Sequence, residues 1–181
     1  MRRSASAASP RSTPTSSQPL TPRTRGEGRS GRAVMFLILV AVVVFVLDRL
    51  TKVAVVRSIP VNGSRPLLGG LVYLTHVQNT GAAFSLGIGL GSFFLAFALV
   101  AVVGIAYAYR HLPPDEQWSR LALGMILGGA IGNALDRVLQ GSVTDFVDFR
   151  WFPVFNTADS FITVGALILA WRMVARRGDA A

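Results

Sequence analysis

Five aspartates in the sequence could do chemistry, since they stand at or near the ends of long apolar runs. They are Asp48, Asp136, Asp145, Asp148 and Asp159. A carboxylate in lipid is costly unless it is partnered or hydrated, so acids so placed indicate a functional site. Two carboxylates close together can hydrolyse an amide, because like charges at short range cannot both ionise. One then acts as general base on water and the other as general acid on the carbonyl oxygen. Spacing alone leaves open which two acids form such a pair.

The elements that must position these acids are apolar segments. Uncharged runs occupy residues 33–47, 86–109, 121–135 and 160–171. A helix that crosses about 30 Å of hydrocarbon needs about 20 residues, so only the second run is long enough by itself. The first must run past Asp48 and the third through Asp136. The fourth must begin before Asp159, using the uncharged stretch 151–158. We therefore expect four transmembrane helices, three of which carry a carboxylate at one end.

Composition supports a membrane protein. Of 181 residues, 51% are apolar and 15% are charged, and the net charge is +9. Residues 1–32 hold seven arginines and one acid, and they lack the apolar residues needed for folding. We expect a disordered basic tail over 1–32, a four-span domain over 33–175 and a short C-terminal tail over 176–181. The remainder carries too little charge for a soluble nucleic-acid binder. The absence of cysteine excludes disulfides and thiolate metal sites.

The distribution of basic residues predicts the orientation. If the basic tail is cytoplasmic, the cytoplasmic segments hold twelve Lys and Arg and the outer segments hold six. This asymmetry agrees with the positive-inside rule. Both termini are then cytoplasmic, and the five aspartates converge at the outer face.

The first outer loop is expected to form a small β platform on the membrane surface. Residues 56–85 contain several turn signals around a β-branched and aromatic stretch, 71–77, which predicts a short strand. The stretch leads to Asn79, whose amide can both donate and accept. His76 is expected to be structural, which makes a histidine metal site improbable. The fold class is thus an all-α membrane protein with four transmembrane helices and a small extracytoplasmic β platform.

The third run ends in a small-residue and polar motif. Gly128 and Gly132 are four residues apart, which predicts a face on which another helix packs closely. Asn133 and Arg137 share a face at the outer end, where they could hold a backbone carbonyl or a carboxylate. Asp136, beside Arg137, is expected to be ion-paired.

The region before the fourth run carries the remaining acids. Asn156 is expected to cap the last helix, which would place Asp159 in its first turn near the positive end of the helix dipole. Asp148 is expected to face solvent and to lie outside the pair.

Two other functions fit acids at one end of a bundle. A proton or ion pathway would continue across the membrane, but the middles of the four runs carry no ionisable residue. A non-enzymatic scaffold would use the acids only as partners for Arg137, Lys52 and Arg49. It predicts that Asp145→Asn or Asp159→Asn weakens folding and nothing else.

Five sequence blocks in order carry a resemblance to a known family. They are Asp48-Arg49-Leu50-Thr51-Lys52, Asn79-Thr80-Gly81-Ala82-Ala83-Phe84-Ser85, Gly132-Asn133-Ala134-Leu135-Asp136-Arg137, Val143-Thr144-Asp145-Phe146-Val147-Asp148 and Phe155-Asn156-Thr157-Ala158-Asp159. The chain resembles lipoprotein signal peptidase (signal peptidase II), the bacterial four-span aspartyl peptidase, from about residue 33 to 173. Two departures are Thr144, where a second valine is common, and a short loop, 146–158, between two of the acids.

The resemblance implies a function and a set of site residues. It implies an aspartyl endopeptidase of the bacterial cytoplasmic membrane that cleaves prolipoproteins just before a diacylglyceryl-cysteine, without metal or cofactor. The implied partners are this lipid-modified substrate and membrane lipid, and we expect a monomer. The implied catalytic dyad is Asp145 and Asp159. The implied supporting residues are Asp48, Lys52, Asn79, Asn133, Asp136, Arg137, Asn156 and Ala158.

Overall fold

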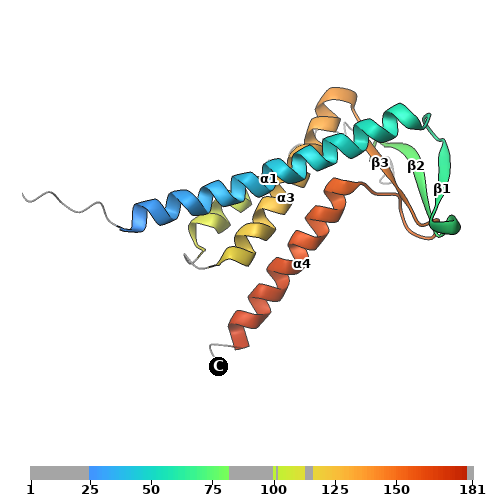
Figure 1. Cartoon of the computed structure of the whole chain (residues 1–181). Coiled ribbons are helices and arrows are strands. Elements are labelled where there is room, and N and C mark those ends of the chain that lie inside the picture. The colour runs from blue at the N-terminus through green and yellow to red at the C-terminus, as the bar shows by residue number, and fades with distance from the viewer. Residues whose placement is uncertain (1–24, 82–99, 101, 113–115, 179–181) are drawn as a thin grey trace, which may run out of the picture.

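The computed structural model describes residues 25–81, 100, 102–112 and 116–178. Three long helices pack against one another, and a small sheet lies at one end of them (Figure 1). In chain order the elements are α1 (Arg25–Ser58), β1 (Ser64–Leu67), the 3-10 helix η1 (Leu68–Gly70), β2 (Val72–Asn79), α3 (Gln117–Gln140), β3 (Val143–Asp148) and α4 (Thr157–Gly178).

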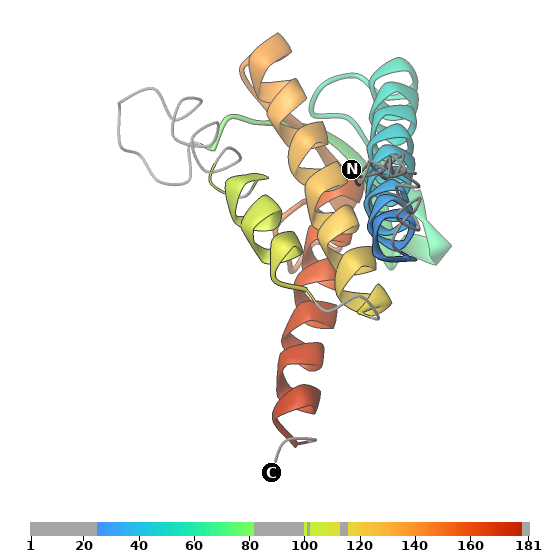
Figure 2. The ribbon, with the colours of Figure 1, turned by 90° about the vertical axis from the view of Figure 1, so that its left-hand side faces the viewer.

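Three helices of the described residues are long and apolar enough to cross a membrane. They cover Gly31–Ser58, Gln117–Gln140 and Thr157–Arg176, and they match the first, third and fourth predicted spans. The predicted second span, 86–109, lies mostly outside the described residues. Its last part, 102–110, is helical and lies beside α3 (Figure 2). There Ile105 packs with Leu37 and Leu123 in a buried apolar cluster. The structure thus describes a mostly helical membrane protein, and the count of four spans stays a prediction.

One predicted boundary is wrong. Helix α1 begins at Arg25, so residues 25–32 are helical rather than part of a disordered tail. The segment after Pro22 contains no proline, so each of its residues can donate a backbone hydrogen bond to the helix. Helix α4 begins at Thr157, before Asp159 and directly after Asn156 as predicted, and it takes in only the last two residues of the stretch 151–158. Pro153 disfavours helix in the preceding residue, and α4 gains its length instead by continuing to Gly178.

Glycines let α3 pack closely between α1 and α4. A Cβ added at Gly128 would collide with the backbone carbonyl of Ala41 in α1. On the other side, a Cβ at Gly129 would lie 2.7 Å from the carbonyl oxygen of Ala158 in α4. A Cβ added at Gly165 of α4 would lie 2.8 Å from the carbonyl oxygen of Ala122 in α3. The predicted small-residue face of α3 is confirmed, and α4 carries a matching glycine.

The predicted platform is a three-stranded antiparallel sheet in the order β1-β2-β3. The predicted strand over 71–77 is confirmed as β2, and the apolar segment with two acids forms β3. Val77 pairs with Asp145 and Tyr73 with Asp148, so β3 runs from the helices toward the β1–β2 turn. The sheet projects sideways from the ends of α1 and α4 (Figure 1).

Candidate active site

Four of the five aspartates come from four different elements and meet where the helices join the sheet. Asp48 lies in α1, Asp136 in α3, Asp145 in β3 and Asp159 in the first turn of α4. The first three are buried, and Asp159 is half-buried. The predicted convergence of these acids is therefore present, and the contacts below define it.

Asn156 joins two of the carboxylates. Its side-chain Nδ2 donates to Asp145 Oδ1 at 2.7 Å, and its backbone N–H donates to Asp159 Oδ2 at 3.2 Å. The Asp159 N–H donates in return to Asn156 Oδ1 at 2.9 Å. These reciprocal bonds are a capping box, which satisfies free N–H groups at the start of α4. The predicted cap is confirmed, and the same residue holds Asp145 and Asp159 together.

Two further amides donate to this pair. Asn79, at the end of β2, donates from Nδ2 to Asp145 Oδ2 at 2.9 Å. Asn133, on α3, donates from Nδ2 to Asp159 Oδ1 at 2.8 Å. Both oxygens of each carboxylate therefore accept a hydrogen bond from an amide N–H, which fixes the orientation of both acids.

Lys52 is a buried cation behind the pair, with 1% of its side chain exposed. Its Nζ donates to Asn133 Oδ1 at 2.8 Å and lies 2.9 Å from Asp136 Oδ2. It also lies 2.9 Å from Asp48 Oδ2, as an ion pair without hydrogen-bond geometry. An ammonium only donates, so Lys52 fixes the Asn133 oxygen toward itself and the Asn133 N–H groups toward Asp159.

Asp48 connects α1 to the start of α4. Its Oδ1 accepts the backbone N–H of Ala158 at 3.1 Å, and Gly132 lies against the same carboxylate. Nearby, the hydroxyls of Thr51 and Thr157 are 2.9 Å apart. A carboxylate at a helix N-terminus is stabilised by the free N–H groups and by the dipole. Asp48 therefore helps to fix the turn that carries Asp159.

Asp136 is ion-paired, as predicted, and its partners include residues from α1. Arg49 lies 2.6 Å from Asp136 Oδ1, and Lys52 bonds Oδ2. Asp136 Oδ2 also accepts the backbone N–H of Thr144 at 3.3 Å, one residue before Asp145. Arg137 donates to the carbonyl of Asn133 at 3.3 Å, as its predicted place on the same face allows.

The expectation that Asp148 faces solvent is wrong. Only 5% of the residue is exposed, and Asp148 accepts from Thr75 at 2.7 Å and from the backbone N–H of Arg150 at 2.7 Å. Pairing of β3 with β2 buries it beside Thr75. The hydrogen bond from Thr75 lowers the pKa of Asp148, so it is held as a carboxylate within the sheet.

Burial raises the pKa of Asp145 to about 6. The nearby charge of Asp159 raises this pKa further, whereas the hydrogen bonds from Asn79 and Asn156 lower it. A carboxyl in this range can hold or release a proton near neutral pH, which suits a general acid.

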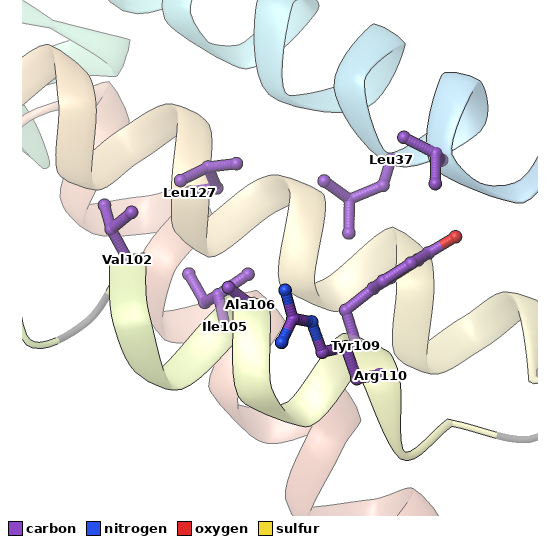
Figure 3. A pocket seen from close by; sticks show the side chains of 8 residues that line it. Leu37, Val102, Ile105, Ala106, Tyr109, Arg110 and Leu127 are labelled. Atoms are coloured by element: carbon purple, nitrogen blue, oxygen red, sulfur yellow. The ribbon is translucent and has the colours of Figure 1, made fainter. Parts of the chain in front are cut away.

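An apolar cavity of about 340 Å³ lies elsewhere in the bundle (Figure 3). Leu37, Ile105 and Leu127 line it, with Tyr109 and Arg110 at one side. Leu37 is eleven residues before Asp48 in the same helix, about 16 Å along its axis. The cavity is therefore separate from the carboxylates.

The sequence analysis missed some contacts of the site and of the opposite end of the bundle. The Thr51–Thr157 contact was not predicted. Thr51 precedes Lys52 and Thr157 follows Asn156, so their place beside predicted site residues was the signal that could have indicated it. At the opposite end, Glu116 precedes α3 and accepts a hydrogen bond from Arg172 of α4 at 2.7 Å. His76 is structural, as predicted: it is buried and donates from Nδ1 to the carbonyl of Ile59 at 2.8 Å.

The chain thus combines helices long and apolar enough to span a membrane with two aspartates that are bridged by Asn156, and comparison with known proteins identifies its family. Residues 40–175 match the profile of the family described as "Signal peptidase (SPase) II". The chain belongs to this family of aspartic peptidases, which cleave signal peptides from prolipoproteins.

Individual relatives agree with this assignment. The lipoprotein signal peptidase of Moorella thermoacetica is 40% identical over 80% of this chain and 97% of its own length. That of Nostoc punctiforme is 46% identical over 71% and 83%. A solved structure described as "Bacterial membrane enzyme structure by the in meso method" at 2.3 Å resolution is 27% identical and superposes with a TM-score of 0.73. The superposition covers 80% of this chain and 91% of that one.

Proposed function

We propose that Asp145 and Asp159 are the catalytic pair of this peptidase and that they share one proton. The observation that carries the proposal is Asn156, which donates to both carboxylates and thereby holds them side by side. The positive charge of Arg137 acts on both acids, and Lys52 and Arg49 neutralise Asp136 and Asp48 behind them. The cluster then has four carboxylates against three cations, and it is neutral when one carboxyl of the pair is protonated.

In the first step, water attacks the carbonyl carbon of the scissile amide. We assign the proton of the resting pair to Asp145, whose pKa is raised to about 6, and the negative charge to Asp159 at the start of α4. Asp159 takes a proton from the attacking water while Asp145 gives its proton to the carbonyl oxygen. The product is a tetrahedral diol, and no metal or covalent enzyme intermediate is required.

In the second step, the diol collapses. Asp159 gives the proton it received to the leaving nitrogen as the C–N bond breaks, and Asp145 takes a proton from one diol hydroxyl. This restores the carboxylic acid of the product and the starting protonation of the pair. Asn79, Asn133 and Asn156 are positioning residues in this scheme, since their amides orient the carboxylates.

The proposed substrate is a prolipoprotein cut on the N-terminal side of a diacylglyceryl-cysteine. The lipid keeps the substrate in the membrane, so its scissile bond lies near the headgroups, at the level where the spans end and the pair lies. We propose that this is the outer face of the bacterial cytoplasmic membrane, that both termini are cytoplasmic, and that the enzyme acts as a monomer surrounded by membrane lipid.

The test is a gel shift of lipid-modified precursor incubated with purified full-length enzyme in detergent. Asp145→Asn and Asp159→Asn are each expected to lower turnover by roughly 10³-fold or more, because each removes one half of the proton relay. The variants should remain folded, as measured by thermal unfolding in the same detergent.

Asp148→Asn is the matched control, since this buried aspartate of the same strand bonds Thr75 and Arg150 rather than the pair. Its turnover per folded molecule should stay within a few-fold of wild type. Normal turnover by either Asp145→Asn or Asp159→Asn would contradict the assignment.

A further inference from the structure

We infer that the far end of the sheet is a lipid anchor that inserts into the headgroup and acyl-chain boundary of the bilayer and holds the strand of Asp145 at its working depth. The anchor consists of Leu67, Leu68, Leu71, Trp151 and Phe152, which we call the platform tip. The inference rests on the proposed function only in giving Asp145 a catalytic role.

The platform tip is exposed and apolar. Leu68 is 76% exposed, Leu71 77% and Trp151 81%, and Leu67 and Phe152 are also exposed. Contiguous exposed apolar side chains on a protein surface mark a contact with a partner or a membrane. Here they come from two segments far apart in the sequence, the β1–β2 turn and the loop after β3.

Specific contacts fix these two segments against each other. The guanidinium of Arg150 lies 3.7 Å from the ring centroid of Tyr73 and donates to Ser64 at 2.8 Å, so the loop after β3 is held on the β1–β2 hairpin. Trp151 makes a tilted ring contact with Phe149, and Phe152 makes an edge contact with Phe155, and both partner rings are less exposed. The tip is thus a preformed surface.

The loop that carries Trp151 and Phe152 is closed at its base. Phe155 bonds back to β3 through both its N–H and its carbonyl, at 3.1 and 2.8 Å to Val147. Asn156 and α4 follow at once. A displacement of the tip would therefore be transmitted to β3, which carries Asp145, and to the cap of Asp159.

The position of the tip favours a bilayer over a protein as its occupant. Three spans end or begin near the sheet, at Ser58, Gln140 and Thr157. The sheet leaves the bundle sideways, with η1 and the loop after β3 together at its far end (Figure 1). Tryptophan is enriched at such boundaries, and the exposed Arg65 of β1 can contact anionic headgroups. The tip thus combines an apolar surface with a nearby exposed basic residue, as an interfacial anchor does.

Depth-dependent fluorescence quenching tests insertion directly. Trp118→Phe and Trp171→Phe leave Trp151 as the single tryptophan of the full-length chain, reconstituted in vesicles of phosphatidylglycerol and phosphatidylcholine. Lipids brominated near the headgroup end of the acyl chain should quench its emission by roughly twofold or more, and aqueous iodide should quench it weakly. Strong iodide quenching without bromolipid quenching would overturn the inference, and it would point to a water-exposed surface or a protein partner.

A second measurement tests whether the anchor serves the reaction. The double variant Leu68→Ser/Leu71→Ser should lower kcat/KM on lipid-modified precursor in these vesicles by roughly tenfold, because misplacing a reacting group by a short distance slows the reaction. Leu68→Phe/Leu71→Phe should keep the activity, because insertion needs only apolar surface. Val61→Ser, a change at a residue 50% exposed outside the tip, is the control.

Wild-type activity of the double serine variant in vesicles would overturn the positioning role. A failure of the catalytic assignment is distinguishable from this, because it would appear as an active Asp145→Asn variant while the quenching of Trp151 stayed unchanged.

Discussion

The two ends of the α3–α4 pair each hold buried acids, but the partners of these acids differ. At one end Glu116 is bonded by the guanidinium of Arg172 at 2.7 and 3.2 Å and by Ser119, with Arg176 at 3.8 Å. At the other end, Asp145 and Asp159 accept hydrogen bonds from amides. The hydrogen bond from Arg172 lowers the pKa of Glu116 and holds it ionised, whereas burial without a directly bonded cation raises the pKa of Asp145, so this acid can gain or lose a proton.

The same division recurs within the active-site end. Asp48 and Asp136 contact Lys52 and Arg49, whereas the proposed pair lies in front of them among asparagines. The comparison teaches that burial alone does not identify a catalytic acid, and that the chemistry of the donors separates the structural acids from the proposed catalytic ones.

Lys52→Met should destabilise the fold, because Lys52 is paired with the two structural acids Asp48 and Asp136. Removing one partner of a buried charge cluster leaves Asp48 and Asp136 without their shared cation, at a cost of about 3–5 kcal/mol in the free energy of unfolding. Thermal and denaturant unfolding in detergent measure it. Lys52→Arg should restore part of the loss, and an unaltered stability of Lys52→Met would show that the cluster is not needed for folding.

The pH dependence of stability should sharpen the comparison. Burial raises the pKa of Asp145 from its ordinary value of 3.8 to about 6. The stabilising effect of the proton on Asp145 is complete below about pH 4 and is lost as the pH rises through 6, with a change of the order of 3 kcal/mol. Unfolding of wild type and of Asp145→Asn between pH 4 and 8 measures it. The Asp145→Asn variant should lack this decrease in stability. Identical dependence of stability on pH in the two proteins would contradict the prediction.

Asn156→Ala should lower activity more than stability. It removes the donor to Asp145 and one half of the capping box, so kcat/KM should fall by roughly 10²-fold, as for other preorganised donors. Ser160→Ala is the control, because Ser160 donates from the same turn to the backbone carbonyl of residue 156. If kcat/KM fell equally in both variants, the loss would come from the hydrogen bonds at the start of α4 and not from the missing donor to Asp145.

Glu116→Gln should have the smallest effect. Its main partner Arg172 is 27% exposed, so the free energy of unfolding should fall by about 1 kcal/mol. The kcat/KM per folded molecule should match wild type. A large loss of activity without a loss of folded protein would erase the distinction between the two ends.

Local patterns predicted the parts of the structure that depend on nearby residues. The cap at Asn156, the place of Asp159 in the first turn, the strand around His76 and the glycine face of α3 all follow from residues a few positions apart. They are present because helix caps, strand periodicity and small-residue spacing act over such short ranges.

Long-range partners were harder to predict. The contact of Asp136 with Arg49, 87 residues away, depends on how α1 packs against α3. The burial of Asp148 depends on Thr75 across the sheet, and the role of Glu116 depends on Arg172 in the last helix. Spacing along one segment carries no information on such pairs.

The capping box of α4 has a consequence for how the last helix enters the membrane. Successive helical residues are rotated by about 100°, so a helix that started one residue earlier or later would turn Asp159 away from Asp145. If Asp145 and Asp159 are the catalytic pair, as proposed, the residue at which the last helix begins decides whether the two carboxylates face each other.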